Sequence, residues 1–290
     1  MQAIGYFIAY YALRVLALLP LPVFYFFADI LYYFVYYLLK YRRGTVYSNL
    51  TKAFPEKSKK EIATIQKAFY HHFSDFLVES LKTIQLNKSQ LARRFRFVNP
   101  ELFTQYYEQG KSVVLVSGHY GNWEWMVHIQ EKVRHRFYAI YKPLKNKQHD
   151  QLIKKIRGKY DSVDQLIPMN DVFRYIINFE KEKQPVIVWF LADQSPPVDY
   201  PFWTNFLNRE TPFYNGPEKI ARKFDFPVVY LSITKTGRGY YEAEFKTLCE
   251  QSAGTKPDEI TRLVVKALEA EIKNHPENWL WSHKRWKHSK

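Results

Sequence analysis

Beyond residue 44, stretches with a helical spacing of apolar residues alternate with short, continuously apolar runs. Apolar residues three and four positions apart predict amphipathic helices, whereas short runs rich in β-branched and aromatic residues are typical of buried strands. Such alternation indicates an α/β fold with a mainly parallel sheet. We expect helices over residues 47–54, 58–84, 100–109, 147–159, 172–181, 218–224 and 257–274, and strands over residues 112–117, 137–141, 186–192, 227–234 and 240–246.

The N-terminal region has a different pattern. Residues 4–39 are almost continuously apolar and aromatic, with prolines at positions 20 and 22, and Lys40, Arg42 and Arg43 follow at once. Residues 23–39 are at the lower length limit for a membrane span. Three interpretations stay open: a spanning helix, a hairpin that enters one leaflet, or a soluble helical pair that covers a core. We expect a hydrophobic membrane anchor with a basic flank over residues 1–43 and one domain over residues 44–290, which the positive-inside rule places in the cytoplasm.

Composition supports a surface that attracts anions. Lys and Arg number 43 against 28 Asp and Glu, a formal net charge of +15, and aromatic residues make up 18% of the chain. Such a field attracts acidic lipids, an acidic protein or nucleic acid. Trp and basic residues interleave in the C-terminal segment 278–290, which predicts contact with an anionic membrane surface; no nucleic-acid motif accompanies it. One cysteine, Cys249, excludes a disulfide framework, and we expect no metal and no cofactor.

The stretch of residues 111–127 holds the candidate chemistry. His119 lies in a turn after the expected strand 112–117, and Glu124 follows five positions later. On a continuous helix the two side chains would lie about 140° apart. If His119 instead lies in the loop, with Gly118 and Gly121 supplying unusual backbone angles, Glu124 falls in the first helical turn and can reach the imidazole. A histidine held by a carboxylate is a general base with its orienting partner; a satisfied core histidine beside a helix-start glutamate is the alternative.

Polar residues also follow two other expected strands, because Tyr141 and Lys142 come after one and Asp193 and Gln194 after another. The carboxyl ends of parallel strands share one edge of a sheet. We therefore expect these residues and His119 to define one site.

These motifs resemble those of the lipid A biosynthesis late acyltransferases, a branch of the glycerolipid acyltransferase superfamily with its H-x4-D/E motif. The segment 118–124, Gly-His-Tyr-Gly-Asn-Trp-Glu, is similar to the signature of that family. The likeness covers most of the chain and extends to Arg42-Arg43 with Asn49-Leu50, Phe54-Pro55-Glu56, Asp193-Gln194, Thr211 to Ala221, and the ending Leu280 to Trp286.

The resemblance implies an αβα acyltransferase core at the cytoplasmic face of an inner membrane. It implies transfer of a fatty acyl group from acyl carrier protein to a hydroxyl of a lipid A precursor, with His119 as base, Glu124 as its partner and no covalent acyl-enzyme. Arg157 matches the position of a family arginine and is the first candidate to bind the anionic acceptor. The expected substrate-binding residues are Arg157, Asp193, Gln194, Lys142, Arg222 and Asn122.

The chain departs from the family where a Phe-Phe-Gly is usual, because its nearest counterpart is Phe206-Leu207-Asn208. This keeps another acceptor open, such as a glycosylated phospholipid or an aminoacyl lipid. A non-catalytic lipid-surface binding protein of the same fold is the alternative from another class, although it would need neither His119 nor Glu124.

Overall fold

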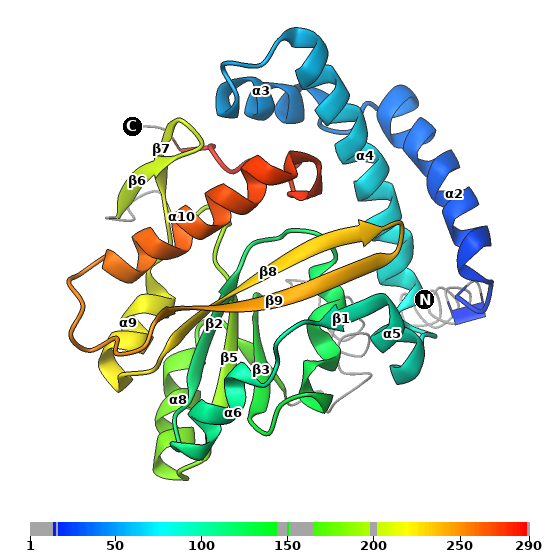
Figure 1. Cartoon of the computed structure of the whole chain (residues 1–290). Helices are drawn as coiled ribbons and strands as arrows, with labels where there is room; N and C mark the ends of the chain where they lie inside the picture. Colours follow the sequence, from blue (N-terminus) through cyan, green and yellow to red (C-terminus); the bar gives the residue numbers. More distant parts are fainter. Residues whose placement is uncertain (1–13, 16, 144–149, 151–164, 198–201, 289–290) are drawn as a thin grey trace, which may run out of the picture.

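The computed structural model describes residues 14–15, 17–143, 150, 165–197 and 202–288. A seven-stranded sheet with the order β1-β9-β8-β2-β5-β3-β4 forms its centre (Figure 1). Every neighbouring pair in it is parallel except β8 and β9. The strands are β1 (Phe95–Phe97), β2 (Val113–Ser117), β3 (Arg136–Tyr141), β4 (Leu166–Pro168), β5 (Val186–Leu191), β8 (Val228–Gly237) and β9 (Tyr240–Cys249).

Helices cover both faces of this sheet. The described helices are α2 (Leu21–Tyr33), the π-helix η1 (Phe34–Leu38), α3 (Arg43–Ala53), α4 (Lys59–Lys82), α5 (Lys88–Arg94), α6 (Leu102–Glu108), the 3-10 helix η2 (Trp123–Glu131), α8 (Val172–Lys181), α9 (Gly216–Phe224), α10 (Glu259–Asn274) and the 3-10 turn η4 (Pro276–Asn278). A separate hairpin consists of β6 (Trp203–Phe206) and β7 (Arg209–Pro212). The prediction of an α/β fold with a mainly parallel sheet is confirmed.

Successive residues of β2 belong to two different apolar cores, because side chains alternate between the faces of a strand. Val114 and Val116 pack with residues of α8 and α9 in one core. Val113 and Leu115 belong to the other, which also contains residues of α4, η2 and the C-terminal segment. Burial on both faces explains why β2 and β5 appear in the sequence as unbroken apolar runs.

Most expected elements appear within a few residues of their predicted ends. Ser58 caps α4 in a full capping box with Glu61, because each side chain bonds to the backbone N–H of the other. The sequence patterns do not predict β1, β4, β6 and β7, because strands of three or four residues are too short to show a period. The expected helix over residues 147–159 lies outside the described residues.

Candidate active site

His119 lies directly beyond the end of β2, where two glycines shape the chain. Gly121 has a φ of +58°, as we expected of it. Gly118 serves another purpose, because a Cβ there would lie 2.6 Å from Leu268 Cδ1 and 3.3 Å from Asp193 Oδ2. The missing side chain therefore lets the backbone before His119 approach α10 and Asp193 closely.

Asp193 contacts His119 twice. Its Oδ1 lies 2.5 Å from the imidazole Nδ1, and its Oδ2 accepts the His119 backbone N–H at 2.8 Å. Asp193 follows β5, which pairs in parallel with β2, so both residues leave the same edge of the sheet. The indole N–H of Trp279 also donates to Asp193 Oδ2, at 2.8 Å. Groups from two distant parts of the chain thus converge on one buried carboxylate.

The other ring nitrogen of His119 faces an amide. Gln194 Nε2 lies 3.1 Å from His119 Nε2. If Nδ1–H donates to the carboxylate, Nε2 keeps a lone pair that accepts the amide hydrogen. Gln194 is exposed, and 13% of the His119 side chain is accessible, so a substrate hydroxyl can replace the amide at Nε2.

Burial alone would raise the pKa of Asp193, but the charge of His119 and the hydrogen bonds from His119 and Trp279 outweigh it. The pKa of Asp193 is therefore well below its usual value. The carboxylate stays ionised, as an orienting partner of a histidine base must.

Glu124 takes a different place from the one we expected. It lies in the first turn of η2, as predicted, but the carboxylate at Nδ1 of His119 belongs to Asp193. Glu124 Oε1 instead accepts the indole N–H of Trp123 at 3.2 Å, and the Trp123 ring packs edge-on against the imidazole with centroids 5.0 Å apart. Glu124 is close to His119 along the chain, but Asp193 is closer in space. Asp193 lies 74 residues after His119, and the pairing of β5 with β2 brings it to the imidazole.

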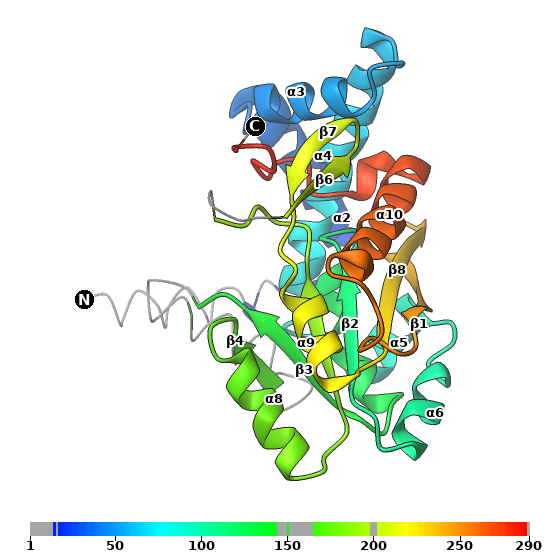
Figure 2. The ribbon, with the colours of Figure 1, turned by 90° about the vertical axis from the view of Figure 1, so that its left-hand side faces the viewer.

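The C-terminal segment forms one wall of the site, and it is not the exposed membrane strip that its composition suggested. Trp279, Trp281 and Arg285 are buried. Gly121 N–H donates to Asn278 O at 3.0 Å, and Leu280 N–H donates to His119 O at 3.2 Å. This segment therefore pairs with the loop of residues 118–122, between β2 and η2, which we call the histidine loop. The segment continues beside the β6–β7 hairpin, where Arg285 and Trp286 bond to β7 (Figure 2).

The C-terminal segment also places a second histidine, His283, near the pair formed by His119 and Asp193. Its burial lowers its pKa to about 4, so the ring is neutral at physiological pH and accepts the Ser195 N–H at 3.4 Å. Sequence reasoning singled out neither His283 nor Trp279 as a site residue. The resemblance of residues 280–286 to the C-terminal motif of the family was the feature of the sequence that pointed to this segment.

Asn122 joins the histidine loop to α4. Its side chain is buried, and its amide N–H donates to Glu79 Oε2 at 2.7 Å. Tyr241 and Tyr25 donate to the same carboxylate, at 2.9 and 3.0 Å. Burial raises the pKa of Glu79 to about 7 in spite of nearby Lys235. Asn122 therefore fixes the histidine loop to α4. This role differs from the substrate contact that we expected of it.

Of the three basic residues that we expected to bind the anionic acceptor, the structure describes two. Lys142 is exposed beyond β3, which pairs with β5, so it lies on the same sheet edge as His119 and Asp193. Arg222 lies in α9, half-buried. Arg157 lies outside the described residues.

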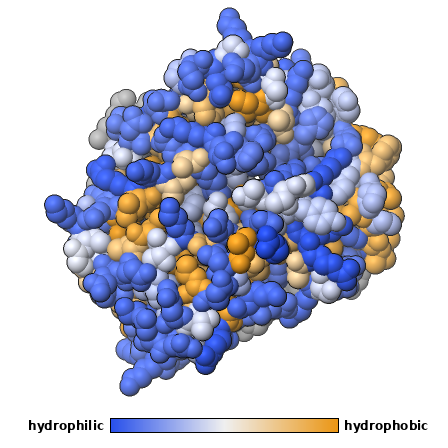
Figure 3. All heavy atoms as spheres, viewed as in Figure 1, coloured by the Kyte–Doolittle hydropathy of each residue, from blue (hydrophilic) through white to orange (hydrophobic). Residues whose placement is uncertain are grey.

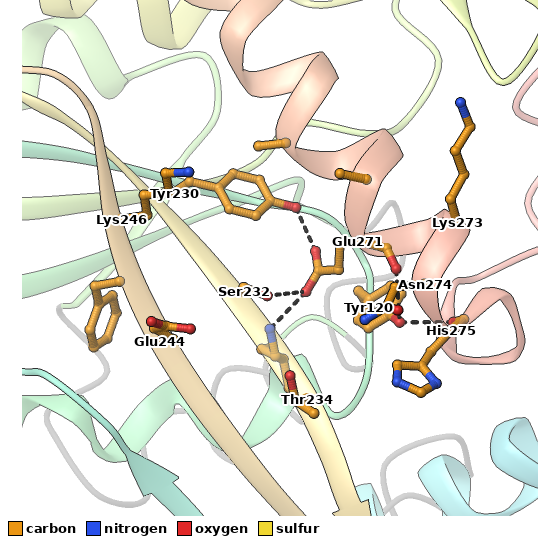
Figure 4. Close-up of a pocket in the computed structure, with 14 residues that line it drawn as sticks. Tyr120, Tyr230, Ser232, Thr234, Glu244, Lys246, Glu271, Lys273, Asn274 and His275 are labelled. Atoms are coloured by element: carbon orange, nitrogen blue, oxygen red, sulfur yellow. Dashed lines mark hydrogen bonds between the residues drawn. The ribbon is translucent and has the colours of Figure 1, made fainter.

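A cavity of about 800 Å³ lies between α10 and the β8–β9 hairpin (Figure 4). Tyr120 reaches it from the histidine loop and donates to His275 O at 2.8 Å. Glu271 on its wall accepts Tyr230 O–H, Ser232 O–H and Ile233 N–H, at 2.5, 3.0 and 2.7 Å. These bonds make Glu271 a link between α10 and β8.

A comparison with protein families decides the class of protein. The family model described as bacterial lipid A biosynthesis acyltransferase matches residues 1–288. The chain belongs to this family. It is therefore an acyltransferase, and membership supports acyl transfer to a lipid by a membrane-associated protein. The resemblance inferred from the motifs is confirmed.

Two further comparisons are less informative. Among solved structures, the chain is similar to the 1-acyl-sn-glycerophosphate acyltransferase PlsC from Thermotoga maritima, with 13% identity and a TM-score of 0.40, over 88% of this chain and 97% of that one. A search of curated proteins finds no match.

Proposed function

We propose that this acyltransferase moves a fatty acyl group from an acyl-carrier-protein thioester to a hydroxyl of a lipid A precursor, at the cytoplasmic face of the inner membrane. The observation that carries the proposal is the contact between His119 Nδ1 and the buried Asp193 carboxylate, in a chain of this family. A neutral imidazole with Nδ1 held by a carboxylate presents Nε2 as a base.

The reaction needs no protein nucleophile. The acceptor hydroxyl replaces Gln194 at His119 Nε2, gives its proton to that nitrogen and attacks the thioester carbonyl. The tetrahedral intermediate then collapses, the carbon–sulfur bond breaks, and the departing thiol takes the proton back from the imidazolium. Asp193 stabilises the imidazolium between these two transfers. Backbone N–H groups in the first turn of η2 are our candidates to bind the oxyanion.

Glu124 supports the same site through its neighbour. By accepting the Trp123 indole N–H, it holds the ring that packs on His119. The proposed contacts to the anionic head group come from Arg157, Lys142 and Arg222, since a guanidinium or ammonium suits phosphate. The net charge of +15 suits docking of an acidic carrier protein, which mainly raises the association rate.

The test is transfer of radiolabelled acyl from acyl carrier protein to a panel of lipid acceptors, with membranes that hold equal amounts of each variant. The panel contains lipid A precursors, glycosylated phospholipids and aminoacyl lipids. We expect a lipid A precursor to be acylated, and kcat to fall at least about a hundredfold in His119→Ala and in Asp193→Asn, as loss of a base or its partner predicts.

Glu124→Gln discriminates between the two carboxylates. The introduced amide can still accept the indole N–H through its oxygen, so we expect a loss of less than about tenfold, because a neutral acceptor replaces a charged one. A loss in Glu124→Gln that exceeds the loss in Asp193→Asn would transfer the orienting role to Glu124. Full activity in His119→Ala would remove the base mechanism, and acylation of another lipid class alone would replace the proposed acceptor.

A further inference from the structure

An apolar strip runs along the outer side of α2 and η1. Of the eighteen large hydrophobic residues exposed in the described part of the chain, eleven lie between residues 15 and 41. The orange residues along the right-hand edge of Figure 3 lie over α2. We define the apolar strip by its most exposed members on these two helices: Phe26, Phe27, Ile30, Tyr33, Phe34, Tyr37 and Leu38. So large a contiguous apolar surface marks a contact with protein or membrane.

The opposite side of the same helices is packed against α4, along which α2 runs in Figure 1. Phe24, Ala28, Tyr32 and Tyr36 are buried on that side, at the four-residue spacing of one helical face. Tyr32 stacks on His71 of α4, with ring centroids 3.5 Å apart. The helix α2 is thus apolar on both sides, and protein covers one of them.

Polar contacts tie α2 to the rest of the fold near its start and at its middle. Before its first turn, Lys82 Nζ donates to the carbonyls of Ala17 and Leu19, each at 2.7 Å. At its middle, Arg238 of the β8–β9 turn pairs with Asp29 at 2.5 Å and with Asp75 of α4 at 2.7 Å. These ties hold α2 alongside α4 and the β8–β9 turn.

This arrangement disfavours a helix that crosses the bilayer. Residues Leu21–Leu38 are long and apolar enough to cross by length and composition. Asp29 lies near the midpoint of that range, so a crossing helix would carry the ion pair with Arg238, together with a β-turn and α4, to the centre of the hydrocarbon. Ionised groups and unpaired turn backbone are expensive there.

Cations lie at the end of the apolar strip. Lys40 and Arg42 are exposed directly after η1, and both have positive φ as the chain turns into α3. Lys40 and Arg43 line an open hollow of about 510 Å³ together with Tyr47 and Gln66. Basic groups beside an apolar strip complement an anionic bilayer surface, where the head groups are negative and the layer beneath is apolar.

We propose that α2 and η1 lie in the plane of an anionic membrane, with the apolar strip immersed in one leaflet and Lys40 and Arg42 at the level of the head groups. The helix pair attaches the protein to the membrane surface along about 27 Å, the length of 18 helical residues, and does not cross it.

Depth-dependent quenching tests this proposal without any acyl transfer. Single cysteines replace Phe26, Ile30, Tyr33 or Tyr37 in the full chain with Cys249→Ser, and each carries a fluorophore. The labelled proteins are bound to vesicles of phosphatidylcholine and phosphatidylglycerol, with nitroxides at three depths on the acyl chains. We expect one shallow depth for all four positions. A crossing helix would separate Phe26 from Tyr37 by about 16 Å in depth, at 1.5 Å per residue.

Leu263→Cys on α10 is the matched control, because Leu263 is also a partly exposed apolar helical residue but lies away from the strip. We expect no quenching there. A monotonic change of depth from Phe26 to Tyr37, or no quenching at any of the four positions, overturns the in-plane arrangement. Equal quenching in vesicles of phosphatidylcholine alone overturns the part assigned to anionic head groups.

Discussion

At the scale of single residues, the candidate site depends on contacts at Asp193 that leave little room for change. Its Oδ2 accepts both the His119 backbone N–H and the Trp279 indole N–H, while Oδ1 faces the imidazole. Each donor favours the ionised carboxylate and fixes its plane. The rate of acyl transfer depends on how Asp193 and His119 are aligned, so a small displacement of either side chain should lower kcat.

Trp279→Phe removes one donor and keeps most of the ring. We expect kcat to fall about tenfold with KM little changed, because Asp193 keeps His119 but loses one bond that fixes its plane. The unfolding free energy should fall by about 1–3 kcal/mol, as loss of a hydrogen bond to a buried charge predicts. Steady-state kinetics and denaturant unfolding measure the two effects. An unchanged kcat would show that Trp279 has only a structural role.

Gly118→Ala tests the close approach beside Asp193. The added methyl would lie 2.6 Å from Leu268 Cδ1 and 3.3 Å from Asp193 Oδ2, so both side chains must move. We expect kcat to fall about tenfold, since a displaced carboxylate no longer aligns His119. Gly254→Ala is the control, because nothing lies within 4 Å of its Cβ position, and it should leave both rate and stability unchanged.

At the scale of elements, α3 holds the C-terminal segment in place. Asn49 is buried on α3 and donates to the carbonyls of Trp281 and His283, at 3.1 and 3.3 Å. Since Leu280 and Asn278 pair with the histidine loop, α3 supports the site through that segment. A change in α3 should therefore reach the site without a direct contact.

Asn49→Ala leaves these two carbonyls without their amide donor. We expect the free energy of unfolding to fall by about 1–3 kcal/mol, the cost of leaving buried acceptors unpaired. Thermal or denaturant unfolding gives the measurement. The control is Thr51→Ala on the same helix, at an exposed position, which should stay within about 0.5 kcal/mol of the parent protein. Equal stability of the two variants would contradict the role of Asn49.

Elements were easier to predict from sequence than the contacts between them. The apolar run of β5 identified a buried strand. Because Asp193 follows this strand, we predicted it at the same edge of the sheet as His119. The contact itself depends on β2 and β5 being neighbours, which no local pattern reveals. Distance along the chain favoured Glu124 for the same reason. Interleaved Trp and basic residues predicted a C-terminal segment that lies along an anionic membrane surface, whereas long-range packing buries Trp281 and Arg285.

At the scale of the whole molecule, two buried carboxyl groups join its parts. Glu79 connects α4, β9, α2 and the histidine loop through Tyr241, Tyr25 and Asn122. Glu271 connects α10 to β8. In each case burial is the main cause that raises the pKa from 4.5 to about 7. Ionisation of either carboxyl group therefore costs free energy at a contact that joins several elements of the fold.

A raised carboxyl pKa sets the sign of the effect of pH on stability. Well below pH 4.5 both groups are protonated in the folded and the unfolded chain, so they add no penalty. As the pH rises from 4.5 through 7, the unfolded chain releases these protons first, so the folded state loses up to about 3 kcal/mol for each group. The double variant Glu79→Gln, Glu271→Gln should flatten this decline, because neither amide titrates.

Denaturant unfolding at intervals between about pH 5 and pH 8 measures the slope. Glu210→Gln, at an exposed position on β7, is the control and should keep the slope of the parent protein. The Glu79 side chain contacts Asn122 in the histidine loop and Tyr25 in α2, so its titration is coupled to that loop more directly than the titration of Glu271 is. The Glu79→Gln variant alone should therefore remove the larger share of any pH dependence seen in protection of the histidine loop from hydrogen exchange. An equal effect from Glu271→Gln would place the sensitive link between α10 and β8 instead.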